Sequence, residues 1–81
     1  MKAAEARRLA ETHTSSALSE AAEALGEEKA PAFEVQGEDD GERLTHVLLA
    51  LRIRSRMDDG ESARDAFRHV MAGVRDVLTN S

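Results

Sequence analysis

Two histidine–carboxylate pairs are the residues of this sequence whose types and spacing come closest to a chemical site. His46 follows Glu42 by four positions and His69 follows Asp65 by four, so on helices each pair shares one face. Packing the two helices against each other, within one chain or across a dimer, would gather two imidazoles and two carboxylates, which suit a metal ion. Metal sites in helical bundles, however, use Glu-x-x-His with further carboxylates, a spacing that neither pair has. The metal site is therefore kept as an alternative, and we expect no cofactor.

Signatures of catalysis are missing from the sequence. It has no cysteine, no Gly-x-Ser-x-Gly motif and no Gly-rich loop of the phosphate-binding type. A chain of 81 residues is also short for enclosing a substrate pocket by itself. We therefore expect no catalytic residues and a protein that is not an enzyme.

The arginines raise a second chemistry, contact with nucleic acid. Four of them flank a Gly-containing turn between two predicted helices, as in a helix-turn-helix protein: Arg52, Arg56, Arg64 and Arg68. They would have to converge on one surface to bind phosphates. The net charge is −5, and residues 43–81 hold seven arginines against five acids, whereas residues 1–42 hold eleven acids against four bases. Because this basic excess is small and no aromatic side chain is free to stack on bases, nucleic-acid binding is kept only as an alternative.

Length and composition describe one small domain over residues 1–81, with residues 1–14 as a loosely attached N-terminal helix. Phe33 and Phe67 are the only aromatic residues, and there is no cysteine for a disulfide. A chain this short buries roughly 60% of its surface on folding, so we expect it to gain stability by forming an oligomer. No apolar run is long enough to span a membrane, and residues 1–13 lack the apolar core of a signal peptide. We therefore expect a cytoplasmic protein that binds no membrane.

Hydrophobic periodicity predicts a mostly α domain of three or four helices. The predicted helices cover residues 2–12, 16–28, 42–57 and 62–79. Pro31 ends the second helix, and the alternation of residues 32–36 predicts one short extended segment. Asp39 and Ser62, each three residues before an acid, occupy the positions of helix N-caps. The short turn between the last two helices predicts a C-terminal helical hairpin.

The segment 42–57 carries two competing patterns, a helical stripe and a strand-like alternation over residues 51–57. The helical stripe consists of Leu44, Val47, Leu48 and Leu51. The length without Gly or Pro favours a helix, on which Leu49 and Ile53 form a second apolar face. We therefore predict that this helix is central and forms the interface of a homodimer. The predicted interface residues are Phe33, Val35, Leu48, Leu49, Leu51 and Ile53.

Residues 23–50, EALGEEKAPAFEVQGEDDGERLTHVLLA, resemble the central segment of a family of short uncharacterised bacterial proteins. The shared features are an acidic Gly-flanked turn and the helix start LTHVL at residues 44–48. The likeness covers about the last three quarters of the chain. Because the family has no assigned activity, the resemblance implies a common loop-and-helix unit and no particular substrate or partner.

These features favour a non-catalytic interaction or accessory module that forms a homodimer. The expected partners are a second copy of the chain and another protein. From the sequence alone, Leu49→Asp is expected to dissociate the dimer, because it places a charge in the predicted interface.

Overall fold

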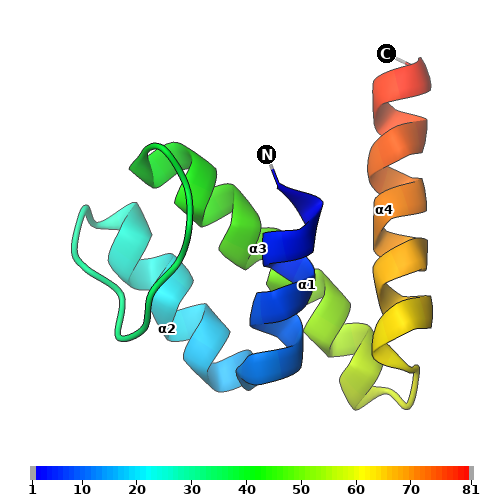
Figure 1. The fold of residues 1–81 in the computed structure, drawn as a ribbon, viewed down its shortest axis with the longest axis horizontal. Helices are drawn as coiled ribbons and strands as arrows, with labels where there is room; N and C mark the ends of the chain where they lie inside the picture. The colour runs from blue at the N-terminus through cyan, green and yellow to red at the C-terminus, as the bar shows by residue number, and fades with distance from the viewer. Residues whose placement is uncertain (1, 81) are drawn as a thin grey trace.

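Four helices make up most of the computed structural model, which describes residues 2–80 and, within them, the side chains up to residue 74. The helices are α1 (Ala3–Thr12), α2 (Ser15–Gly26), α3 (Asp40–Asp58) and α4 (Ala63–Asn80) (Figure 1). Residues 2–80 contain no strand, and the predicted extended segment 32–36 lies in the connection between α2 and α3. The mostly α class, the four helices and the hairpin of α3 and α4 are therefore confirmed, and residues 49–57 are helical.

Side-chain caps fix where three of the helices begin. Thr14, Asp39 and Ser62 each accept a hydrogen bond from the backbone N–H three residues later, at 3.1, 2.8 and 3.1 Å. Each such cap stabilises its helix by about 1 kcal/mol relative to alanine. The starts of α2, α3 and α4 are thus set by local sequence, as predicted for Asp39 and Ser62.

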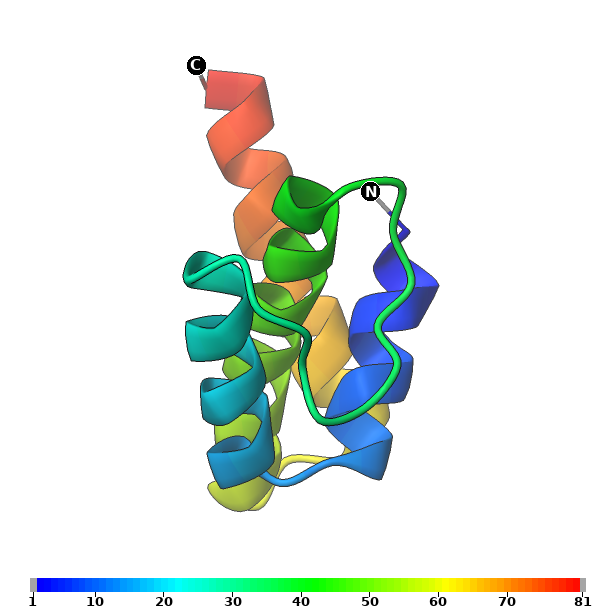
Figure 2. The same ribbon diagram turned by 90° about the vertical axis from the view of Figure 1, so that its left-hand side faces the viewer.

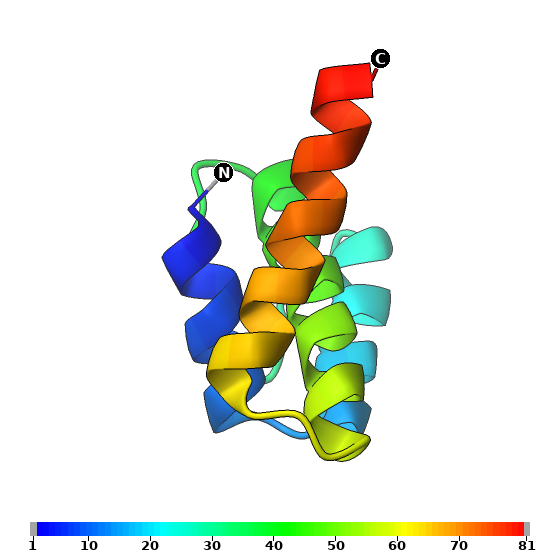
Figure 3. The ribbon, with the colours of Figure 1, turned by 90° about the vertical axis from the view of Figure 1, so that its right-hand side faces the viewer.

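The third helix, α3, is the central element, because α1, α2 and α4 all pack against it (Figures 2 and 3). The side chains of α3 that are fully buried are those of His46, Val47, Ala50 and Ile53. The α1 helix contributes three fully buried residues, namely Ala6, Leu9 and Ala10. Two of these are alanines, and small side chains allow two helices to approach closely. The weakly apolar sequence of α1 gives little sign of this burial.

The helices form a thin body. The Cα atoms extend over 31 × 31 × 17 Å, and one helix with its side chains is about 10–12 Å wide, so the shortest dimension holds about two helices. The C-terminal end of α4 rises beyond the other helices (Figure 1). Within residues 2–80, no helix has the length and apolar character needed to cross a membrane.

Two turns contain a residue with a left-handed backbone, and they allow a matched test of the fold. Glu28, after α2, has φ 61°, and Gly60, after α3, has φ 109°. A residue with a side chain pays about 1–2 kcal/mol to adopt this conformation, and glycine avoids that cost. Glycine also gives the unfolded chain more freedom, which offsets part of the gain. Glu28→Gly is therefore expected to raise the free energy of unfolding by about 0.5–1 kcal/mol. Thermal unfolding followed by circular dichroism measures this change.

Gly60→Ala is the control for that prediction. A methyl group at Gly60 would meet no atom within 4 Å, so only the backbone conformation is affected. We expect a loss of about 1 kcal/mol. If the free energy of unfolding changes in the same direction in Glu28→Gly and Gly60→Ala, one of the two turns does not have the left-handed backbone described.

Candidate interaction surface

The six residues predicted to form an interface separate into three groups in the structure. Val35, Leu49 and Ile53 are buried within the chain. Phe33 and Leu51 are half-buried, and the Phe33 ring stacks on His13 with ring centroids 3.7 Å apart. Only Leu48 is left exposed, at 48%. The structure therefore places half of the predicted set in the core of one chain.

The surroundings of α3 explain this separation. Three neighbouring helices pack against α3. The exposed residues of α3 mark the side that these helices cover least, where Leu51, Arg52 and Ser55 also line a hollow against α4. An apolar stripe runs along this side, formed at helical spacing by the half-buried Leu44 and Leu51 and the exposed Leu48. Exposed polar residues border it: Thr45, Arg52 and Ser55. These six residues are called the open face of α3 below.

Charge is distributed unevenly along α3. Its first turn contains Asp40 and Glu42, whereas arginines occupy positions 52, 54 and 56 near its end. Several of these charges have local partners: Asp40 with Arg43 at 2.9 Å, Arg54 with Asp58 at 3.0 Å and Arg56 with Glu61 at 2.7 Å. Among the described side chains, Arg52 on the open face has no ion-pair partner. The first turn of α3 is therefore acidic and residues 52–56 are basic, although the helix itself ends at Asp58.

The four residues of the metal alternative do not come together. His46 is fully buried and its Nε2 lies 3.9 Å from the Glu42 carboxylate. His69, on α4, binds Glu61 at 2.6 Å rather than Asp65. The contacts of His69 with Arg56 place it near the end of α3, about 15 Å along the helix from His46. Within the described residues, no three His, Asp or Glu side chains are grouped so that they could hold a metal ion.

The four arginines of the nucleic-acid alternative are also divided between two places. Arg52 and Arg56 line a hollow of about 380 Å³ between α3 and α4. Arg68 lines a different groove, between α4 and α1. Arg64 lies one helical turn before Arg68 on that side of α4. They therefore do not form one basic surface.

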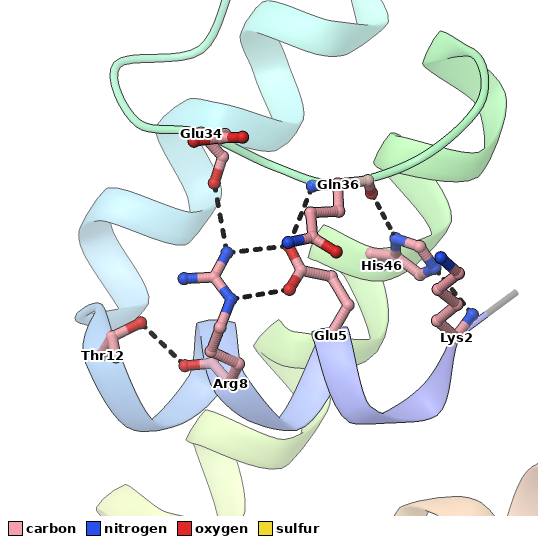
Figure 4. A network of polar contacts seen from close by, with 7 residues as sticks. All are labelled: Lys2, Glu5, Arg8, Thr12, Glu34, Gln36 and His46. Atoms are coloured by element: carbon pink, nitrogen blue, oxygen red, sulfur yellow. Dashed lines mark hydrogen bonds and ion pairs between the residues drawn. The ribbon is translucent and has the colours of Figure 1, made fainter.

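A cluster of polar side chains ties the α2–α3 connection to α1 and α3 (Figure 4). The carboxylate of Glu5, a residue only 5% exposed, accepts hydrogen bonds from Arg8 at 2.6 and 2.8 Å and from the backbone N–H of Gln36 at 2.9 Å. The backbone N–H of Lys2 donates to Nε2 of His46 at 3.0 Å, and Nδ1 of His46 lies 2.7 Å from the Gln36 carbonyl oxygen. Because Nε2 accepts, Nδ1 carries the proton and donates it to that carbonyl.

This cluster positions the chain rather than presenting a reactive group, because both ring nitrogens of His46 are used in holding the backbone. Sequence reasoning paired His46 with Glu42 and did not single out Glu5. The sequence does contain one signal for the Glu5–Arg8 ion pair, because residues three positions apart lie on the same face of a helix. The contacts to Gln36 and Lys2 join segments 31 and 44 residues apart, and no local pattern predicts them.

The cluster makes stability depend on pH. The hydrogen bond from Arg8 lowers the pKa of Glu5 below its ordinary value of 4.5. A carboxylate with a lowered folded-state pKa stabilises the protein above its unfolded-state pKa, and this contribution is lost as the pH falls through the folded-state value. We therefore expect the unfolding temperature to drop below pH 4.5. Glu5→Gln is expected to lose about 1–2 kcal/mol at pH 7 and to approach the wild type in acid.

Thermal unfolding measured from pH 7 to pH 3 tests this prediction. Glu20→Gln is the control, because Glu20 is exposed on α2 and its carboxylate has no ion pair among the described side chains. Parallel curves for wild type and Glu5→Gln over this range would contradict the contribution assigned to the Glu5 charge.

Comparison with known proteins places the chain in a family. The model of DUF6952, described as a family of unknown function, matches residues 1–79. The chain therefore belongs to this family, and the expected membership of a family without assigned function is confirmed. The match includes α1 as well as residues 23–50, which carry the resemblance. No curated protein and no solved structure matches the sequence.

Proposed function

We propose that this member of the DUF6952 family is a non-catalytic interaction module that forms a homodimer through the open face of α3. The observation that carries the proposal is the exposure of Leu48, which stands between two further leucines on the least covered side of the central helix. An exposed large apolar side chain within an apolar stripe is typical of a protein–protein contact.

The size of the chain supports association. The body is 17 Å across its shortest dimension, so little of it lies far from solvent. Small domains without disulfides commonly gain stability by burying a further apolar surface between copies. Covering Leu44, Leu48 and Leu51 would extend the core from one chain into the next.

Charge complementarity supports an antiparallel arrangement. A two-fold axis near Leu48 pairs the two helices symmetrically about that residue. A residue that lies a given number of positions after Leu48 in one copy then faces the residue that lies the same number of positions before Leu48 in the other copy. Arg52, which has no ion-pair partner among the described side chains, then lies near the acidic first turn of the other α3. Arg56 lies opposite Asp40 of the other copy, but each of these two is already paired within its own chain. A parallel arrangement would place like charges together, which costs stability.

The interior polar groups support a structural role. Among the described residues, no buried side-chain nitrogen or oxygen lacks a hydrogen-bond partner. The buried carboxylate of Glu5 and the buried ring of His46 are both engaged in holding the backbone. Such satisfied groups are typical of polar interactions that specify a fold.

Cross-linking of single-cysteine variants tests the arrangement, since the natural chain has no cysteine. Leu48→Cys is expected to form a disulfide-linked dimer under mild oxidation, because the axis brings the two copies of residue 48 together. Ser19→Cys, exposed on α2, is the control. Cross-linking of Leu48→Cys no faster than that of Ser19→Cys would contradict the proposed interface.

A mixture of two further variants tests the direction. In an antiparallel pair, Leu44→Cys and Arg52→Cys chains are expected to cross-link with each other faster than either does alone. The two copies of residue 44 lie about 12 Å apart along the helices, beyond the Cα separation that a disulfide tolerates. Preferential linkage of residue 44 to its own copy would indicate a parallel pair.

A further inference from the structure

A second apolar surface lies between α1 and α4, separate from the leucine stripe of α3. It is an open groove of about 720 Å³, bordered by Ala3 on α1 and by Phe67, Met71 and Val74 on α4. Figure 3 shows α4 passing beside α1 and continuing beyond it. The three α4 residues are half-buried, so the body of the chain covers them only in part. They span about two helical turns, which is the contact length of a short packed helix.

Arginines border this groove. Arg68 lines it, and Arg64 lies one turn earlier on the same side of α4. From α1, the guanidinium of Arg7 lies over the Phe67 ring, 5.5 Å from its centroid. One carboxylate, that of the exposed Asp65, also lines the groove, and Arg7 is paired with Glu11. The groove therefore combines an apolar floor with an edge on which Arg64 and Arg68 outnumber Asp65.

Arg64 and Arg68 lack carboxylate partners, and this indicates which charge a ligand of the groove would carry. In the described chain, five arginines are ion-paired, and one of them, Arg7, borders the groove: Arg7 with Glu11, Arg8 with Glu5, Arg43 with Asp40, Arg54 with Asp58 and Arg56 with Glu61. Among the described side chains, neither Arg64 nor Arg68 has such a partner, although the chain holds 16 acids against 11 bases. Two arginines without an ion-pair partner among the described side chains, against the single carboxylate of Asp65, leave this edge of the groove with a net positive charge on an acidic protein, which favours a ligand that is both apolar and anionic.

We propose that this groove binds an amphipathic helix with acidic flanks from a different protein. A helix laid along α1 and α4 would place its apolar residues on Phe67 and Met71 and its carboxylates beside Arg68, in the manner of other helix-in-groove complexes. A second copy of this chain fits less well. Its α2 has an acidic outer side with Glu20, Glu23 and Glu27, but its apolar residues Leu18, Ala21 and Leu25 are already buried. This surface is additional to the proposed dimer interface.

The test uses two synthetic helical peptides and fluorescence anisotropy. Both peptides carry leucines along one face, and the flanking positions hold glutamate in one and lysine in the other. The wild-type protein is expected to bind the glutamate peptide, with an affinity that falls as salt is added, and to bind the lysine peptide at least about tenfold more weakly. Amide shifts in NMR spectra are expected to change along α1 and α4 rather than on the open face of α3.

Matched charge reversals assign the contact to the groove. Arg68→Glu is expected to weaken binding of the glutamate peptide by about tenfold or more. Lys29→Glu, which reverses an exposed charge in the α2–α3 connection, is expected to leave this binding unchanged. Met71→Asp is expected to weaken binding of both peptides. Circular dichroism confirms that each variant is folded.

Three outcomes would overturn the assignment. The first is equal affinity for the two peptides or no binding of the glutamate peptide. The second is binding that Arg68→Glu does not change. The third is a change of the protein's own molar mass caused by Arg68→Glu, which would make the groove a contact between copies. None of these depends on whether Leu48 forms a dimer interface, so the two proposals fail separately.

Discussion

Replacing Leu48 by aspartate is expected to convert the proposed dimer into a folded monomer. Leu48 is 48% exposed in the single chain, so the substitution removes few contacts within the chain. In an antiparallel dimer, by contrast, it would bury two carboxylates next to each other on the two-fold axis. An uncompensated buried charge costs about 3–5 kcal/mol, which raises the dissociation constant by more than about a hundredfold.

Sedimentation velocity and far-ultraviolet circular dichroism together measure this outcome. Ser19→Asp, which places the same charge on the exposed side of α2, is expected to remain dimeric. A Leu48→Asp protein that stays dimeric at low micromolar concentration would contradict the assignment of the interface to the open face of α3. A Leu48→Asp protein that unfolds would show that this residue supports the single chain.

Replacing the next residue, Leu49, is expected to have a different and larger effect, namely unfolding. Leu49 is 7% exposed and belongs to the core cluster, to which all four helices contribute. Loss of a buried leucine costs about 2–5 kcal/mol, and burial of a carboxylate adds several more. A domain of 81 residues has a stability of only about 4–12 kcal/mol. Leu49→Asp is therefore expected to lose its cooperative thermal transition.

Two adjacent leucines thus separate association from folding. Circular dichroism and a one-dimensional proton NMR spectrum of Leu49→Asp, compared with Leu48→Asp, measure the difference. The sequence pattern alone led to the expectation that Leu49→Asp would dissociate a dimer, and the burial of Leu49 within the chain is the reason for the changed expectation. A folded, monomeric Leu49→Asp protein would support the original expectation instead.

The local features of the fold could be predicted because local interactions determine them. Asp39 and Ser62 cap helices by bonding to backbone groups three residues away. The turn at Gly60 requires a left-handed backbone that glycine adopts readily. The helices and the hairpin of α3 and α4 follow from such signals together with hydrophobic periodicity.

The inward and outward faces of α3 could not be predicted in this way. Apolar residues occur around most of that helix, so periodicity does not indicate which side a neighbour covers. Burial of Leu49 and Ile53 depends on how the other helices pack against α3. One of these helices, α1, contributes two alanines and one leucine as its fully buried residues, which is a weak signal in the sequence. The bonds of Glu5 and His46 to the α2–α3 connection likewise depend on packing between distant segments.

Molar mass by light scattering on a size-exclusion column tests homodimerisation most directly. The measurement covers about a hundredfold range of protein concentration, because the fraction of dimer depends on the concentration of the protomers. The chain has a mass of 8.8 kDa. The proposed interface predicts twice that mass over the range for the wild type and the single-chain mass for Leu48→Asp. A wild-type protein with the mass of one chain at every concentration would contradict the homodimer and leave the open face of α3 to a different partner.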